Sequence, residues 1–247
     1  EGLSTRGVSS PIEPLWLRLL CLSLVLCVVS PLGGRYASEE GTMGIFDMFK
    51  KKTKINGMIK YLKLEDWWLN ELNDEERRII LSTYSPIGSE SSIIDGEICR
   101  SNQTPLHFFW GLIGWFNKPD LRHVAYKLIA KAETLINEQS EPLDIHFLYG
   151  AKLDVCYRDR DLRPNGLELA IQACEQQIEN APFAATVFIE KYGGNLPAHK
   201  GYRQLAIVLE KQKRYGEVVS LCEKAKSQGW AGDWDKRIDR CKKRSKA

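Results

Sequence analysis

The sequence lacks the short motifs that carry most phosphate, zinc and nucleophile chemistry. It contains no G-x-x-x-x-G-K loop, no H-E-x-x-H pair, no G-x-S-x-G elbow and no G-x-G-x-x-G fingerprint. Histidine is scarce too, and we expect the four that occur, His107, His123, His146 and His199, to lie on different helices. A lone histidine on a helix is most often a surface or core residue. We therefore expect no enzymatic activity, no metal site and no cofactor.

Paired cysteines and an excess of one charge are also missing. The seven cysteines include no C-x-x-C pair, and their spacing indicates neither a disulfide framework nor a zinc site. Cys156, Cys174 and Cys222 instead fall on apolar helical stripes, where a free thiol behaves as a small hydrophobic side chain. This usage is typical of a reducing compartment. The formal net charge of +3 is too small to indicate a nucleic-acid partner by itself.

No stretch alternates apolar and polar residues for long enough to predict a strand. Apolar residues recur instead at i, i+3, i+4 and i+7, the spacing that places them on one face of a helix. This period is clearest over residues 120–139. Residues 201–230 show it twice, on either side of a short polar break at 211–214, as expected for two antiparallel helices joined by a tight turn. The sequence therefore predicts an all-α fold.

The order of stripes and breaks divides the chain into four regions. Residues 1–42 hold a hydrophobic segment outside the core, 43–55 form a basic and apolar tail, 56–104 hold a helical pair with a long loop, and 105–247 form a helical domain. Two helix starts are marked locally: Asn73 with Glu76 forms a capping box, and Thr104-Pro105 combines a capping hydroxyl with a proline at the first helical position. Of the adjacent Trp67 and Trp68, we expect only one to point fully inward.

The stretch from 201 to 230 resembles the tetratricopeptide repeat, whose signature begins W-x2-L-G-x2-Y. The matching residues are Tyr202, Leu205, Ala206 and Leu209, followed by Tyr215 at the turn and Ala225 near the end. Trp110, Ile113 and Gly114, and then Ala170, Cys174 and Pro182, follow parts of the same signature. The resemblance implies an α-solenoid of antiparallel helix hairpins with a C-terminal capping helix at 234–244, and a concave face that binds a peptide or partner protein.

The first 42 residues allow three interpretations. The most hydrophobic run, 15–29, is interrupted by Arg18 and is shorter than the ~20 residues that a membrane-spanning helix needs. Residues 1–42 are thus an imperfect signal or anchor, a fragment of a longer precursor, or residues upstream of a true start at Met43. We favour the last, because the sequence from Met43 resembles the start of many bacterial cytoplasmic proteins. We expect a cytoplasmic location, with membrane association or export as the alternative.

The function that these patterns favour is that of a non-enzymatic scaffold for protein–protein interaction. The candidate partner-binding residues are polar side chains on the helix that follows residue 199 and two tryptophans near the C-terminal helix: Lys200, Arg203, Gln204, Trp230 and Trp234. A plain solvated face is the alternative interpretation of Lys200 and Arg203.

Two other classes of partner stay open. The C-terminal helix carries a basic patch, which predicts contact with nucleic acid: Lys236, Arg237, Arg240, Lys243 and Arg244. Cations late in a helix are also favoured by the helix dipole, so nucleic acid is the less favoured partner. A membrane is the other alternative, through residues 15–29 or through 45–54, where lysines adjoin apolar side chains.

Overall fold

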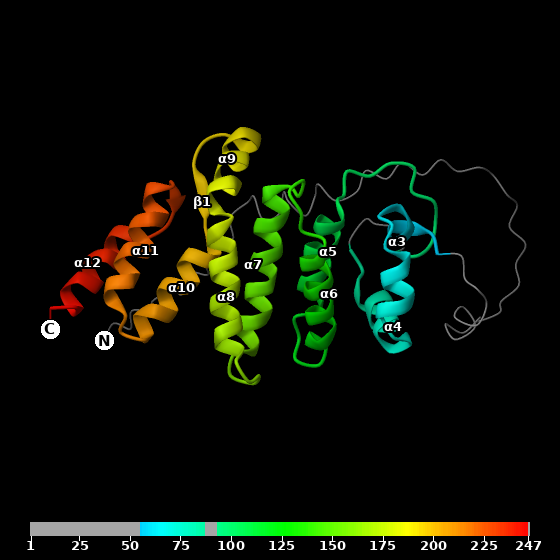
Figure 1. Cartoon of the computed structure of the whole chain (residues 1–247), viewed down its shortest axis with the longest axis horizontal. Helices are drawn as coiled ribbons and strands as arrows, with labels where there is room; N and C mark the ends of the chain where they lie inside the picture. Colours follow the sequence, from blue (N-terminus) through cyan, green and yellow to red (C-terminus); the bar gives the residue numbers. More distant parts are fainter. Residues whose placement is uncertain (1–54, 87–92, 247) are drawn as a thin grey trace, which may run out of the picture. The chain divides into compact units, whose positions relative to one another are not determined.

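The structure, a computed structural model, describes residues 55–86 and 93–246. Over these residues the chain is mostly helical with two short strands, which confirms the prediction of an all-α fold (Figure 1). The predictions for residues 1–42, for 43–54 and for the candidate membrane segments 15–29 and 45–54 lie outside this part of the chain. No described helix has the length and apolar content needed to cross a bilayer. The described chain divides into unit 1, residues 55–72, 85–86 and 93–102, and unit 2, residues 73–84 and 103–246.

Unit 1 contains helix α3 (Gly57–Tyr61), the π-helix η1 (Trp67–Glu71) and the segment 93–102. The backbone amides of Asn56 and Gly57 donate to the carbonyl oxygens of Ile94 and Gly96, each at 2.9 Å. The hydroxyl of Tyr61 donates to the carbonyl oxygen of Ser101 at 2.9 Å. The described end of the expected long loop is therefore fastened to α3 by hydrogen bonds.

Trp67 and Trp68 are both buried, with 3% and 1% of their surface exposed, so the expectation that only one points inward is wrong. Their ring centroids lie 6.1 Å apart in an edge-to-face arrangement. The reason is local, since both residues lie in η1, and a π-helix turns less per residue than an α-helix. Adjacent side chains therefore diverge less and reach the same core.

Unit 2 begins with α4 (Asp74–Thr83), then α5 (Pro105–Ile113), the 3-10 turn η2 (Gly114–Phe116) and α6 (Arg122–Thr134). The capping box is confirmed: the side chain of Asn73 accepts from the amide of Glu76, and the Glu76 carboxylate accepts from the amide of Asn73. The hydroxyl oxygen of Thr104 likewise accepts from the amide of His107 at 3.0 Å. Most of α5 is apolar, and it packs against both α6 and α7, which buries it on more than one side.

The centre of unit 2 is made of α7 (Pro142–Asp159), α8 (Gly166–Glu179) and α9 (Ala181–Tyr192). Gln177 of α8 joins three elements, because its amide nitrogen donates to the carbonyl oxygen of His146 at 2.9 Å and its amide oxygen accepts from the backbone of Gly201 at 2.7 Å. Asn180 is at once the C-terminal cap of α8 and the N-terminal cap of α9. No loop therefore separates the two helices. The Asn180 side chain also donates to the carbonyl oxygen of Pro142 at 2.8 Å, which ties this corner to α7.

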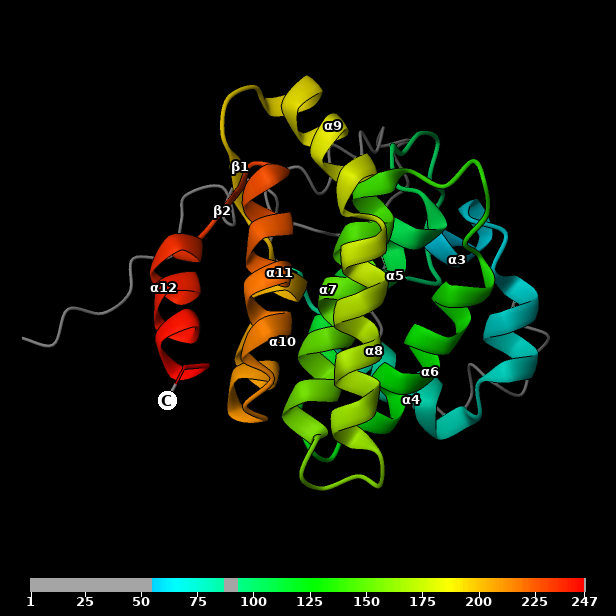
Figure 2. The ribbon, with the colours of Figure 1, turned by 60° about the vertical axis from the view of Figure 1, so that its left-hand side comes forward.

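The C-terminal part contains α10 (Lys200–Lys211), α11 (Tyr215–Ser227) and α12 (Trp234–Arg244), which lie side by side in Figure 2. Two short strands, β1 (Leu196–Ala198) and β2 (Trp230–Ala231), pair in parallel. No strand is predicted from the sequence; these two are too short to show a period, and their pairing joins the chain before α10 to the chain after α11. A single hydrophobic cluster then extends from Leu143 of α7 to Cys241 of α12.

Candidate binding groove

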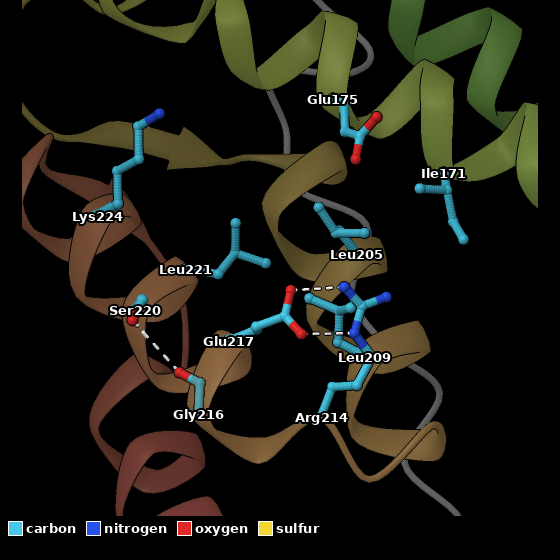
Figure 3. Close-up of a pocket in the computed structure, with 10 residues that line it drawn as sticks. All are labelled: Ile171, Glu175, Leu205, Leu209, Arg214, Gly216, Glu217, Ser220, Leu221 and Lys224. Atoms are coloured by element: carbon cyan, nitrogen blue, oxygen red, sulfur yellow. Dashed lines mark hydrogen bonds and ion pairs between the residues drawn. The ribbon is translucent and has the colours of Figure 1, made fainter.

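An open groove of about 410 Å³ lies between α8, α10 and α11 (Figure 3). Its residues come from all three helices and from the turn between α10 and α11: Ile171, Glu175, Leu205, Leu209, Arg214, Gly216, Glu217, Ser220, Leu221 and Lys224. A space of this size lies within the range of ligand pockets in proteins and holds a few side chains of a partner.

The floor of the groove is aliphatic. Leu205 and Leu209 are one turn apart on α10 and are buried, because their stripe packs against α8 and α11. Ile171 of α8 and Leu221 of α11 are only partly buried and complete the floor from the two sides. Burial of the surface that Ile171 and Leu221 still expose would be favourable at about 25 cal/mol per Å² of apolar surface.

The rim of the groove is charged. Arg214 donates two hydrogen bonds to the Glu217 carboxylate, each 2.6 Å long, and these bonds lower the pKa of Glu217 (Figure 3). The negative charge of Glu175 also acts on Arg214. Lys224, by contrast, is exposed and makes no ion pair with any residue that the structure describes. The groove therefore combines an aliphatic floor with one cation, Lys224, and one carboxylate, Glu175, that are in no ion pair in the described chain.

The predicted face of α10 lies on the opposite side of that helix. At 3.6 residues per turn, Lys200, Arg203 and Gln204 are about 100° to 180° around the helix axis from Leu205 and Leu209. The Lys200 ammonium pairs with the Asp154 carboxylate of α7 at 2.5 Å, and Arg203 is exposed. The amide nitrogen of Gln204 is buried and makes no hydrogen bond within the described chain. None of these three residues lines the groove.

Trp230 and Trp234 are buried to 2% and 4% exposure, so their prediction as partner-contacting residues is wrong. The indole nitrogen of Trp234 donates to the backbone oxygen of Trp230 at 2.6 Å, and the indole nitrogen of Trp230 donates to the Gln228 side chain at 3.1 Å. Trp230 lies in β2, and its ring contacts His146 of α7 and Phe188 of α9, while Trp234 opens α12. Both tryptophans are core residues that fix the C-terminal helices.

Three of the five residues of the basic patch on α12 share one carboxylate, that of Glu210 of α10. Arg240 donates two hydrogen bonds to its carboxylate, at 2.7 and 2.8 Å, and Arg237 and Arg244 each donate one, at 2.9 and 2.8 Å. These bonds, with Arg240 contributing most, lower the pKa of Glu210. Arg237 is also buried, which contradicts its assignment to a surface patch. Lys236 and Lys243 are exposed and make no ion pair in the described part of the chain.

The structure brings together two histidines that the sequence places far apart. His146 of α7 and His199, the N-cap of α10, have ring centroids 5.0 Å apart, and both rings contact the indole of Trp230. Burial lowers the pKa of His146 to about 4 and that of His199 to about 3. The Nδ1 atom of His199 accepts from the amide of Tyr202 at 3.2 Å. This histidine pair is neutral near pH 7 and serves packing and capping.

No group of three or more His, Cys, Asp or Glu residues able to hold a metal ion occurs in the described chain. Four of its five free thiols are buried, and burial raises the pKa of Cys174 to about 12 and that of Cys222 to about 11. Such thiols are poor nucleophiles at neutral pH. Comparisons with protein-family models, with curated proteins and with solved structures found no match.

Proposed function

We propose that this protein is a non-enzymatic scaffold that binds a partner protein, and that the groove between α8, α10 and α11 receives an amphipathic helical segment of that partner. The observation that carries the proposal is the aliphatic floor beside the unpaired ammonium of Lys224. A cytoplasmic location forms part of the proposal and is supported by the free thiols of the described cysteines.

The packing of unit 2 supports this class of function. Helices α7 and α8, and then α10 and α11, pack as consecutive pairs, and α12 packs against α11 at the C-terminal end. A stack of helix pairs with a terminal cap is the arrangement that the resemblance to tetratricopeptide repeats implies, and such stacks bind segments of other proteins along their surfaces. The hollow lies on the Leu205 and Leu209 side of α10, so we assign binding to that side in place of the Lys200 side.

The groove specifies the chemistry of the partner segment. Aliphatic side chains at helical spacing would cover the floor formed by Leu205, Leu209 and Leu221. A carboxylate on the same face would pair with Lys224, because the other cation of the rim, Arg214, is already paired with Glu217. The preferred segment is therefore an apolar helical face that carries one acidic residue.

A designed peptide tests the proposal. The probe is a fluorescein-labelled, alanine-based helix with three leucines at i, i+4 and i+7 and one glutamate on the same face. We expect saturable binding to the full chain by fluorescence anisotropy. Leu221→Glu places a carboxylate on the aliphatic floor and should weaken binding by about tenfold or more.

Leu162→Glu is the matched control, because Leu162 is 73% exposed in the connection between α7 and α8 and does not line the groove. It should leave peptide affinity unchanged. Circular dichroism confirms that both variants keep their helical content. Anisotropy that does not saturate, or an equal loss of affinity in both variants, would refute the groove as the binding site.

The nucleic-acid alternative receives less support. Three of the five residues of the predicted basic patch, Arg237, Arg240 and Arg244, share the Glu210 carboxylate. A phosphate backbone would have to compete with that carboxylate for each of them.

A further inference from the structure

Helix α9 presents an uncovered apolar face. Seven large apolar side chains of the described chain are more than a third exposed, and three of them, Phe183, Ile189 and Tyr192, lie on this one helix. Phe183 is 65% exposed and Ile189 51%. Single exposed apolar residues are ordinary, whereas a group on one helix indicates a contact surface.

Two of the three exposed side chains, Phe183 and Ile189, border one side of α9, whereas Tyr192 lies about 180° around the helix axis from Phe183. At 3.6 residues per turn, Phe183 and Ile189 lie about 120° apart around the axis and about 9 Å apart along it. Glu190 falls between them on the helical wheel, is exposed and makes no ion pair within the described chain. This face therefore has two apolar anchors and one free carboxylate, which are the features that the groove with its free Lys224 requires.

We infer that the groove of one copy of this chain receives α9 of a second copy, with Phe183 and Ile189 on the aliphatic floor and Glu190 paired with Lys224. This inference rests on the proposed function, because it names the occupant of the same groove. The two surfaces are complementary in two respects: Glu190 and Lys224 are opposite charges that make no ion pair in the described chain, and the exposed Phe183 and Ile189 match Ile171 and Leu221, the only partly buried residues of the floor.

A copy cannot place this face in its own groove. The inner side of α9, with Ala184 and Phe188, is buried against the core, and Asn180 fixes the start of the helix to α7. The outer face of α9 is thus held away from α8, α10 and α11 of the same chain. Because the two surfaces differ, the contact is head-to-tail, and each added copy leaves one groove and one α9 open.

A mixing experiment tests the head-to-tail contact. Phe183→Glu should inactivate α9 only, and Ser220→Trp should fill the groove only, since Ser220 is an exposed lining residue. For the full chain, the weight-average mass measured by sedimentation equilibrium should rise steadily above 28.2 kDa with concentration. Each variant alone should stay at the mass of one chain. Their equimolar mixture should form a 1:1 complex of twice that mass and nothing larger.

Leu162→Glu again serves as the matched control and should associate like the unmodified chain. Lys224→Glu should weaken association several-fold, and the double variant Lys224→Glu, Glu190→Lys should restore it. Masses that stay at one chain for the unmodified protein, or a Ser220→Trp variant that still dimerises by itself, would overturn the inference. If the designed peptide binds while the chain does not self-associate, the proposed function stands and only this inference falls.

Discussion

Lowering the pH from 7 to 5 is expected to destabilise unit 2 by about 4 kcal/mol through the histidine pair, His146 and His199. Both side chains are nearly inaccessible to water, with 5% and 0% of their surface exposed. Burial is the largest cause of their lowered pKa values, and the charges of Lys200 on His146 and of His146 on His199 add to it. Protonation inside this aromatic cluster would therefore place charge where nothing compensates it.

The direction in which the free energy of unfolding changes with pH follows from proton binding. In the unfolded chain both histidines titrate near 6.5, whereas in the folded chain they titrate near 4 and 3. Between these values the unfolded state binds more protons, so the free energy of unfolding falls as the pH falls. At pH 5 each histidine has lost about 2 kcal/mol of its contribution, at 1.36 kcal/mol per pH unit. A total of about 4 kcal/mol is a large part of the 5 to 15 kcal/mol that is typical of a domain.

Urea unfolding followed by circular dichroism at pH 7, 6 and 5 measures this loss. His146→Phe removes one titrating group and keeps a flat ring against Trp230, so the pH-dependent loss should fall by about half. His199→Asn removes the other and keeps a capping acceptor for the amide of Tyr202. Burial also lowers the pKa of His107, so a small residual slope should persist in the double variant.

The paired carboxylates contribute little to the loss of stability between pH 7 and pH 5. Glu76 and Glu210 have pKa values below 4.5, so their contributions are lost at a lower pH than the histidine window. A free energy of unfolding that is the same at pH 7 and pH 5, or a slope that both variants leave unchanged, would refute the reasoning.

Two further predictions concern buried polar contacts. Glu210→Gln should lower the free energy of unfolding by about 2 to 4 kcal/mol, because three arginines lose a shared and nearly buried carboxylate. The amides of α12 should then exchange their hydrogens faster. The control is Glu223→Gln, which removes a single exposed ion pair of 3.4 Å and should cost less than about 1 kcal/mol. Gln177→Leu should cost about 2 kcal/mol in urea unfolding, because the amide of Gly201 loses its buried acceptor, while Gln172→Leu on the exposed side of α8 should change little. Equal effects in a variant and its control would contradict either account.

The elements that the sequence predicts best are those whose signals are local. The Asn73 capping box and the Thr104-Pro105 start depend on residues within one turn, and both form as expected. The stripe of Leu205 and Leu209 also identifies the buried side of α10 correctly. A stripe does not show how completely neighbouring helices cover it, so the groove left over this stripe could not be located from spacing.

The features that the sequence does not predict depend on contacts between distant segments. Trp230 and Trp234 adjoin a basic helix in sequence, but the pairing of β1 with β2 and the packing of α12 turn both indoles inward. The histidine pair forms where Gln177 bridges α7 and the start of α10, and no local pattern marks His146 or His199 as neighbours. The Glu210 cluster arises in the same way, since its arginines follow it by 27 to 34 residues.

The corner at Asn180 has a mechanical consequence. One residue ends α8 and begins α9, and its side-chain amide donates to the Pro142 carbonyl oxygen. The connection between the two helices therefore contains no flexible residues that could absorb an applied force. A load applied to the outer end of α9 would pass directly into the backbone of α7 and α8. A short flexible spacer inserted after Asn180 would remove this rigid corner and leave α9 held by the packing of residues such as Ala184 and Phe188 against the core.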